Sequence, residues 1–172
     1  FVVFRVLLYF WLLDQQAHPL LAILCGYCRD SLLRLTSSFI LSFSEGAVVN
    51  RKMLEEFIEH LQPGRFSPAT LKSTTQNINS SWTQSGHLKG HSQKSRTYAK
   101  AMPGSVAYAL FLGYLTGVRG ESLFQTEFTK LLDCSIEHAI GLAEEASRRG
   151  WIVFKRIGKT IEVLFPSLLT QQ

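Results

Sequence analysis

The strongest constraint on the fold is a helix whose start and end are both marked by residue type. Ser67 and Pro68 pair a hydroxyl N-cap with proline at the first helical position, which predicts that a helix begins there. Gly86 supplies the left-handed residue that commonly follows a helix, so the helix is predicted to run to about Ser85. One stripe of this helix is predicted to face a core and consists of Leu71, Thr75, Ile78 and Trp82.

The rest of this helix surface is polar but almost uncharged. Serine, asparagine and threonine are mediocre helix formers, and a helix that needs only solubility would favour glutamate and lysine. Amide and hydroxyl side chains are suited to hydrogen bonds with phosphates and base edges. The face therefore favours contact with a nucleic acid. It consists of Lys72, Ser73, Gln76, Asn77, Asn79, Ser80 and Thr83.

Short β-rich segments and basic turns follow two of the predicted helices. Residues 87–98 contain a strand-like segment, a basic turn at Gly90 and a return segment. Near the C-terminus, residues 151–154 and 160–165 flank a basic turn that contains Gly158, which predicts a β-hairpin. A helix followed by a basic-tipped hairpin is the order found in a winged helix, and it occurs twice in this chain.

The remaining segments predict a mainly α fold. Apolar residues at helical spacing, flanked by proline, glycine or N-cap residues, predict helices at 1–13, 20–28, 31–43, 51–61, 105–115, 122–131 and 136–149. We therefore expect a helical protein with two winged-helix-like units, each a helix-turn-helix plus a small β-hairpin. The expected boundaries are an N-terminal module at 1–100 and a C-terminal module at 101–172.

The distribution of charge is more informative than its total. The chain has a formal net charge of +5, yet no acidic residue occurs between Glu59 and Glu121, where seven cations fall. Such a stretch predicts a surface for a polyanion. A solvated basic face with no partner is the alternative that this pattern leaves open.

The candidate DNA-binding residues follow from the basic stretch, the polar helix face and the second hairpin. They are Arg65, Lys72, Gln76, Asn79, Lys89, Lys94, Arg96, Lys100, Arg148, Arg149, Lys155, Arg156 and Lys159. We expect the cations of the two hairpins to share one face and to contact the phosphate backbone.

The apolar run at residues 1–13 is expected to be a buried helix. It is interrupted by Arg5 and is shorter than the roughly twenty residues of a membrane span, and it lacks the small-residue cleavage site of a signal peptide. Because the chain opens at Phe1 in mid-pattern, we expect its N-terminus to be truncated or trimmed. No membrane partner is expected.

The three cysteines do not form a disulfide framework. Cys25 and Cys28 make a lone CxxC without two further zinc ligands at suitable spacing and without the preceding strand of a thioredoxin-like motif. Two buried thiols one helical turn apart are the favoured interpretation, and Cys134 is far away in the sequence. Free thiols are typical of a reducing compartment, so we expect a cytoplasmic protein.

Motifs of common catalytic sites do not occur in the sequence. It contains no GxSxG elbow, HExxH motif, P-loop or dinucleotide-binding glycine pattern. We therefore expect no enzyme activity, no cofactor, no bound metal and no small-molecule substrate.

Several of these segments together resemble one protein family. The central segment 66–72, followed by Asn77 and by Ser85 to Gly90, is similar to the central signature of the BrxA family of BREX (bacteriophage exclusion) defence systems. The segment 107–115 with its following glycines, the helix ending at Gly150 and the hairpin around Gly158 extend the resemblance to about residues 20–166. Family members carry additional N-terminal residues that this sequence lacks.

The resemblance implies a mostly helical DNA-binding protein that contributes to phage resistance without known catalysis. It also implies that other BREX proteins (methyltransferase, phosphatase-like and ATPase components) are possible partners. Our first hypothesis is binding of double-stranded DNA with little sequence preference. The alternatives are a protein-docking or assembly subunit of the BREX complex, and an RNA-binding protein.

Overall fold

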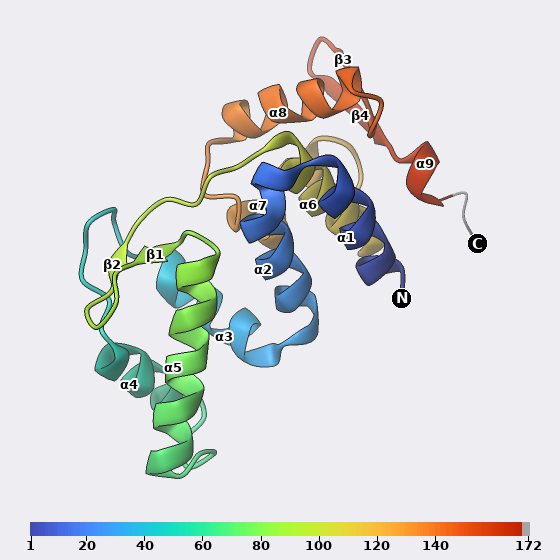
Figure 1. Cartoon of the computed structure of the whole chain (residues 1–172). Helices are drawn as coiled ribbons and strands as arrows, with labels where there is room; N and C mark the ends of the chain where they lie inside the picture. Colours follow the sequence, from blue (N-terminus) through green and yellow to red (C-terminus); the bar gives the residue numbers. More distant parts are fainter. Residues whose placement is uncertain (170–172) are drawn as a thin grey trace. The chain divides into compact units, whose positions relative to one another are not determined.

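A computed structural model describes residues 1–169 and divides the chain into two compact units (Figure 1). One unit is the continuous segment Gly26–Ala99, and the other combines Phe1–Cys25 with Lys100–Gln172. The described part is mainly helical and contains two small antiparallel hairpins, which confirms the predicted fold class. The expected module boundary near residue 100 is close to the observed one, but the first 25 residues belong with the C-terminal segment instead of with residues 26–99.

The discontinuous unit is held together by contacts between its two segments. The central helix α6 (Pro103–Leu115) is buried from Pro103 to Gly113. The hydroxyl of Tyr108 on α6 donates to the carbonyl oxygen of Val3 at 2.9 Å. The carboxylate of Asp14 accepts from the N–H of Gly104 at 2.8 Å. Residues 1–25 therefore complete the core around α6, and this is why the N-terminal assignment from sequence differs from the structure.

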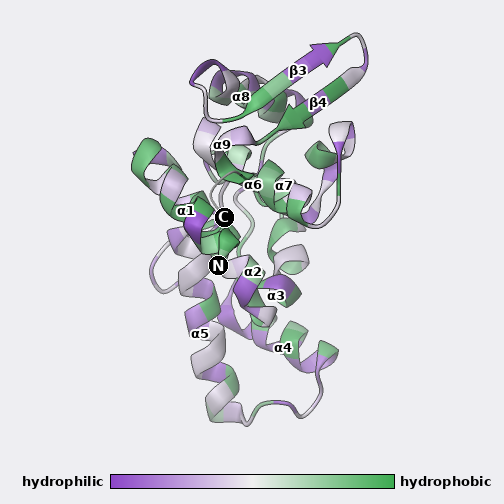
Figure 2. Cartoon of the chain, turned by 90° about the vertical axis from the view of Figure 1, so that its right-hand side faces the viewer, coloured by the Kyte–Doolittle hydropathy of each residue, from purple (hydrophilic) through white to green (hydrophobic). Residues whose placement is uncertain are grey.

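The other elements of the discontinuous unit surround α6. From its first segment come α1 (Val2–Leu13), η1 (Gln15–Ala17) and most of α2 (His18–Arg29). From its second segment come η2 (Gly120–Gln125), α7 (Glu127–Lys130), α8 (Ile136–Arg148), β3 (Val153–Ile157), β4 (Thr160–Leu164) and α9 (Pro166–Leu169). Figure 2 shows green, hydrophobic residues on α6, among which Val106, Leu110 and Phe111 are fully buried.

Two details of this unit differ from the sequence prediction. The predicted helix 122–131 is broken into η2 and α7 at Thr126, whose side chain caps α7 by accepting from the N–H of Thr129 at 3.2 Å. The N-terminal helix α1 is only partly buried, since Phe4 and Leu12 are exposed while Phe10 is fully buried. Within residues 1–169, no helix has both the length and the apolar character that crossing a membrane requires.

The free cysteines differ in their surroundings. Cys25 is buried on α2, whereas Cys28 and Cys134 are partly exposed. Burial raises the pKa of the Cys134 thiol, and the neighbouring Asp133 carboxylate raises that pKa further. This thiol is therefore a weaker nucleophile at neutral pH than an ordinary free cysteine.

The unit Gly26–Ala99 has the complete order of elements of a winged helix. Its helices are α3 (Ser31–Leu41), α4 (Arg51–Leu61) and α5 (Pro68–Gln84), and its short strands are β1 (Leu88–Lys89) and β2 (Ser95–Arg96). The helix bounds agree with the prediction for α4 and α5, while α3 ends two residues earlier than the predicted Phe43.

A third extended segment, residues 46–49, joins the small sheet and was missed in the sequence. Val48 bridges Ser95, and the N–H of Val49 donates to the carbonyl oxygen of Lys94 at 2.9 Å. The N–H of Arg96 donates in turn to the carbonyl oxygen of Ala47 at 2.8 Å. The segment between α3 and α4 therefore pairs with β2, which pairs with β1, and so the wing is anchored to the helices.

The core of this unit is centred on the predicted stripe of α5. Trp82 is fully buried, and its indole Nε1–H donates to the hydroxyl of Thr36 on α3 at 3.3 Å. Thr75 and Ile78 are also buried, whereas Leu71 is only partly buried. The prediction that this stripe faces a core is confirmed.

Candidate nucleic-acid interface

Helix α5 presents a polar face that contains no acidic residue. Its N-cap Ser67 accepts a hydrogen bond from the N–H of Thr70 at 3.3 Å, as the Ser-Pro start predicts. Lys72 and Gln76, which are both candidate DNA contacts, are exposed. The other exposed polar residues in the middle of this helix are Ser73, Asn77 and Ser80.

The solvent-accessible polar face of α5 contains fewer residues than the sequence predicts. Asn79 is only 5% exposed, because α5 packs against α4 on this side, so Asn79 does not belong to the outer face. Thr83 is half-buried, and its hydroxyl donates to the carbonyl oxygen of Asn79 at 2.7 Å. The hydroxyl of Ser73 donates to the carbonyl oxygen of Thr70 at 3.1 Å, which is the usual bond of such residues within helices. In the middle of α5 the exposed amides are therefore those of Gln76 and Asn77.

The wing between β1 and β2 carries two exposed or partly exposed lysines. Lys89 on β1 is exposed, and the Lys94 ammonium donates to the carbonyl oxygen of Gly90 at 2.7 Å. Gly90 has a φ of +112°, and a Cβ at this position would collide with the carbonyl group of Gln93. The tight wing therefore requires glycine at position 90.

Arg96, predicted as a DNA contact, is instead a buried structural residue. It is 2% exposed, and its Nε–H donates to the carbonyl oxygen of Ile40 in the last turn of α3 at 3.0 Å. Its Nη1 donates to the carbonyl oxygens of His87, at 3.2 Å, and Thr97. The guanidinium thus joins the end of α3 to both sides of the hairpin, and it cannot reach a phosphate.

A concavity of about 580 Å³ lies where α4, α5 and the wing meet, and we call it the α4 concavity. It is lined by Asn50, Arg51, Lys52, Gln76, Asn79, Ser80, His91, Ser92 and Lys94. Three of these side chains are Lys or Arg, and none is acidic. The structure therefore brings the predicted residues Gln76, Asn79 and Lys94 together in one basic depression.

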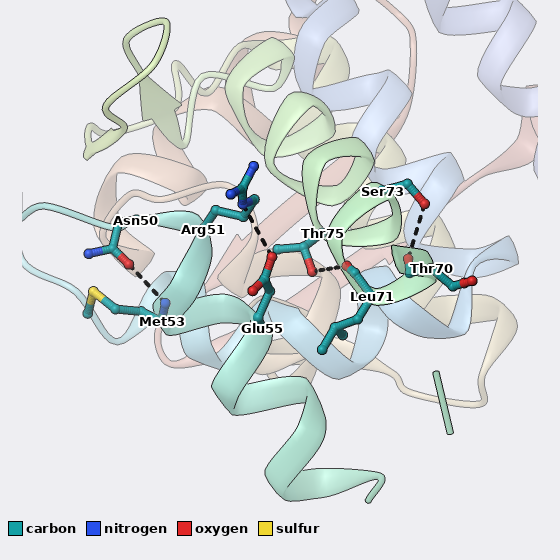
Figure 3. A network of polar contacts seen from close by, with 8 residues as sticks. All are labelled: Asn50, Arg51, Met53, Glu55, Thr70, Leu71, Ser73 and Thr75. Atoms are coloured by element: carbon teal, nitrogen blue, oxygen red, sulfur yellow. Dashed lines mark hydrogen bonds and ion pairs between the residues drawn. The ribbon is translucent and has the colours of Figure 1, made fainter. Parts of the chain in front are cut away.

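The start of α4 was missed as part of the site. Asn50 is the N-cap of α4, and its side-chain oxygen accepts from the N–H of Met53 at 2.9 Å (Figure 3). Arg51 forms an ion pair with Glu55 in which Nε and Oε1 are 3.2 Å apart. The pair Arg51-Lys52 directly after an N-cap was the available signal, because cations beside free helix N–H groups suit an anion.

The other predicted cations are exposed but lie outside this concavity. Arg65 hydrogen-bonds Gln62, and its Cζ lies 4.8 Å from the centroid of the Phe66 ring. Lys100 belongs to the discontinuous unit, where it begins the second segment. Arg149 is paired with Glu145 at 2.7 Å. The remaining candidates in the discontinuous unit are Arg148, Lys155, Arg156 and Lys159. Because the two hairpins belong to different units, a common face for their cations stays a prediction.

The helix preceding the second hairpin is unlike α5. The exposed residues of α8 include Ile136, Glu137, His138 and Glu144. Two carboxylates on this face would repel phosphates, so α8 does not repeat the surface chemistry of α5. The resemblance between the two units is one of element order and not of surface.

The two units are therefore helical modules with a wing-like hairpin, and the helix before the hairpin is free of acidic residues in Gly26–Ala99 (α5) but not in the discontinuous unit (α8). Comparisons with protein-family models, with curated proteins and with solved structures found no match for this chain. Within residues 1–169, no group of three or more His, Cys, Asp or Glu side chains is placed to hold a metal ion.

Proposed function

We propose that this protein binds duplex DNA without catalysing a reaction, through the unit Gly26–Ala99. The α4 concavity carries this proposal, because cations from α4 and the wing lie there beside amides of α5. In helix-turn-helix proteins the second helix enters the major groove while the first helix crosses the backbone. In this arrangement α5 presents Lys72 and Gln76 to the groove, and the wing presents Lys89 to the backbone.

The first experiment is a fluorescence titration of a labelled duplex across a salt series. The unit contributes five cations near the proposed contact surface, namely Arg51, Lys52, Lys72, Lys89 and Lys94. If each neutralises one phosphate, the logarithm of the binding constant falls with the logarithm of salt concentration with a slope of about −4.5. Binding that is independent of salt, or absent at low ionic strength, would contradict the proposal.

A competition experiment separates DNA from RNA. Unlabelled DNA duplexes of unrelated sequence are expected to displace the labelled duplex equally well, since phosphate contacts carry no sequence information. An RNA duplex is expected to compete less well, because its deep and narrow major groove does not admit α5. Stronger competition by RNA would favour the alternative RNA-binding function.

For the discontinuous unit we propose a docking role beside other BREX proteins. The resemblance to the BrxA family supports BREX as the setting, and the apolar and acidic face of α8 supports a protein partner over a nucleic acid. Changing Glu137 and Glu144 to Arg is expected to abolish copurification with BREX components in cells that carry the whole system. Duplex affinity should not decrease in this variant.

The matched control for this experiment is Glu162→Arg, which reverses an exposed glutamate on β4 instead of on α8. Copurification should survive this change. Equal loss in both variants, or retention in the α8 variant, would count against docking through α8. Loss of phage resistance with intact DNA affinity in the α8 variant would further support a partner role.

A further inference from the structure

We infer that the α4 concavity is a binding site for a single phosphate group at the N-terminus of α4. Helix α4 has 11 residues, and its first two N–H groups, those of Arg51 and Lys52, have no acceptor among the residues that the structure describes. The third N–H, of Met53, is already bonded to the Asn50 cap. Free N–H groups and the positive end of the helix dipole together favour an anion at this point.

The side chains around this helix terminus have the charge that a phosphate needs. Lys52 is exposed and forms no ion pair within the described part of the chain, and Lys94 approaches from the wing. Arg51 contributes less, because its Nε lies 3.2 Å from the Glu55 carboxylate. Glu55 does not line the concavity, so it does not place a negative charge in it.

Asn79 provides independent support for a ligand. It lines the concavity but is only 5% exposed, and its Oδ1 is buried without a hydrogen-bond partner in residues 1–169. An unsatisfied buried polar atom costs about 1–3 kcal/mol. Nδ2 of the same amide also has no acceptor in residues 1–169 but, unlike Oδ1, is not inaccessible, so in the orientation shown it can donate to a phosphate oxygen in the concavity.

The phosphate group that this site binds can come from two sources. One is a backbone phosphate of duplex DNA, in which case the inference deepens the proposed function and rests on it. The other is the phosphate group of a small molecule. In both cases the predicted contacts are the N–H groups of Arg51 and Lys52, the ammonium of Lys52 and the amide of Asn79.

The first experiment titrates the full chain with inorganic phosphate and follows backbone amide resonances by NMR. The N–H signals of Arg51 and Lys52 are expected to shift with one saturating curve, together with the Asn79 side-chain signals. Lys52→Ala should weaken phosphate binding about fivefold. The matched control is Arg29→Ala, which removes an exposed cation that does not line the concavity and should leave binding unchanged.

A second variant separates a binding role from a structural one. Asn79→Leu removes the unsatisfied amide at similar volume, so it should keep or raise the melting temperature of the protein. Phosphate affinity should nevertheless fall, because the donor is lost. Shifts scattered over unrelated amides, or equal affinity in Lys52→Ala and Arg29→Ala, would overturn the inference.

Titration with a duplex distinguishes the two sources. If the site holds a backbone phosphate, Lys52→Ala reduces the magnitude of the salt slope by about 1. If the protein binds inorganic phosphate at this site but ignores duplexes, the site serves a small molecule and the proposed function fails. If it binds duplexes normally while Arg51 and Lys52 do not respond to phosphate or duplex, the inference fails and the proposed function stands.

Discussion

Replacing Arg96 with Ala is expected to lower the free energy of unfolding of the unit Gly26–Ala99 by about 3 kcal/mol. The side chain is 2% exposed and donates to the carbonyl oxygens of Ile40, His87 and Thr97. Removing it takes one hydrogen-bond donor from each of these carbonyl oxygens, although His87 and Ile40 still accept from backbone N–H groups, and it opens a space at the end of α3. The hairpin then loses its side-chain attachment to the helices.

This loss can be measured by urea unfolding followed through the fluorescence of Trp82. Trp82 is buried in this unit, so Trp11 and Trp151 of the other unit should first be replaced by Phe. Lys94→Ala is the matched control, because it removes a nearby cation that is less buried. Arg96→Ala with full stability but weakened DNA binding would mean that the guanidinium contacts phosphate after all.

Neutralising three lysines together is expected to have the largest effect on DNA binding. Changing Lys52, Lys89 and Lys94 to Ala removes the charges at the start of α4 and on the wing. Each phosphate contact adds about 0.9 to the magnitude of the salt slope, so losing three contacts should lower the affinity at 0.1 M salt by nearly three orders of magnitude, about 500-fold. The loss should be similar for unrelated sequences, since these contacts read no bases.

The comparison for this triple variant is the second hairpin. Changing Lys155, Arg156 and Lys159 to Ala removes three exposed charges beside the acidic face of α8, and it should weaken binding less than the first triple variant does. Mobility-shift titrations at one salt concentration would rank the variants. An unchanged affinity in the first variant, with melting temperature intact, would show that the unit Gly26–Ala99 is not the contact surface.

The sequence predicts the helices of the winged unit well, because their ends depend on local residues. Ser67, Pro68 and Gly86 act within one turn of the termini of α5, and Asn50 does the same for α4. The segment 46–49 was missed because its strand character comes from pairing with Ser95, far away in the chain. Local propensity does not determine such non-local pairs.

The same distinction explains the errors in the candidate site. Arg and Lys are almost always exposed, so residue type alone placed Arg96 on the surface, whereas its burial follows from three carbonyl groups that tertiary structure brings together. Asn79 was assigned to the outer face of α5 because asparagine is usually exposed, whereas it is only 5% exposed in the structure. Lys72, Gln76 and Lys89 were assigned correctly to the exposed surface, because no partner element covers them.

The discontinuity of the unit built on α6 has a consequence for synthesis of the chain on the ribosome. Residues 1–25 emerge before the winged module, but the helix that packs on Phe10 and bonds Val3 and Asp14 is translated only after all of residues 26–99. The inserted winged module can therefore complete its fold while the N-terminal helix still lacks its partner. Until α6 emerges, the apolar surface of that helix is open to chaperones and to aggregation.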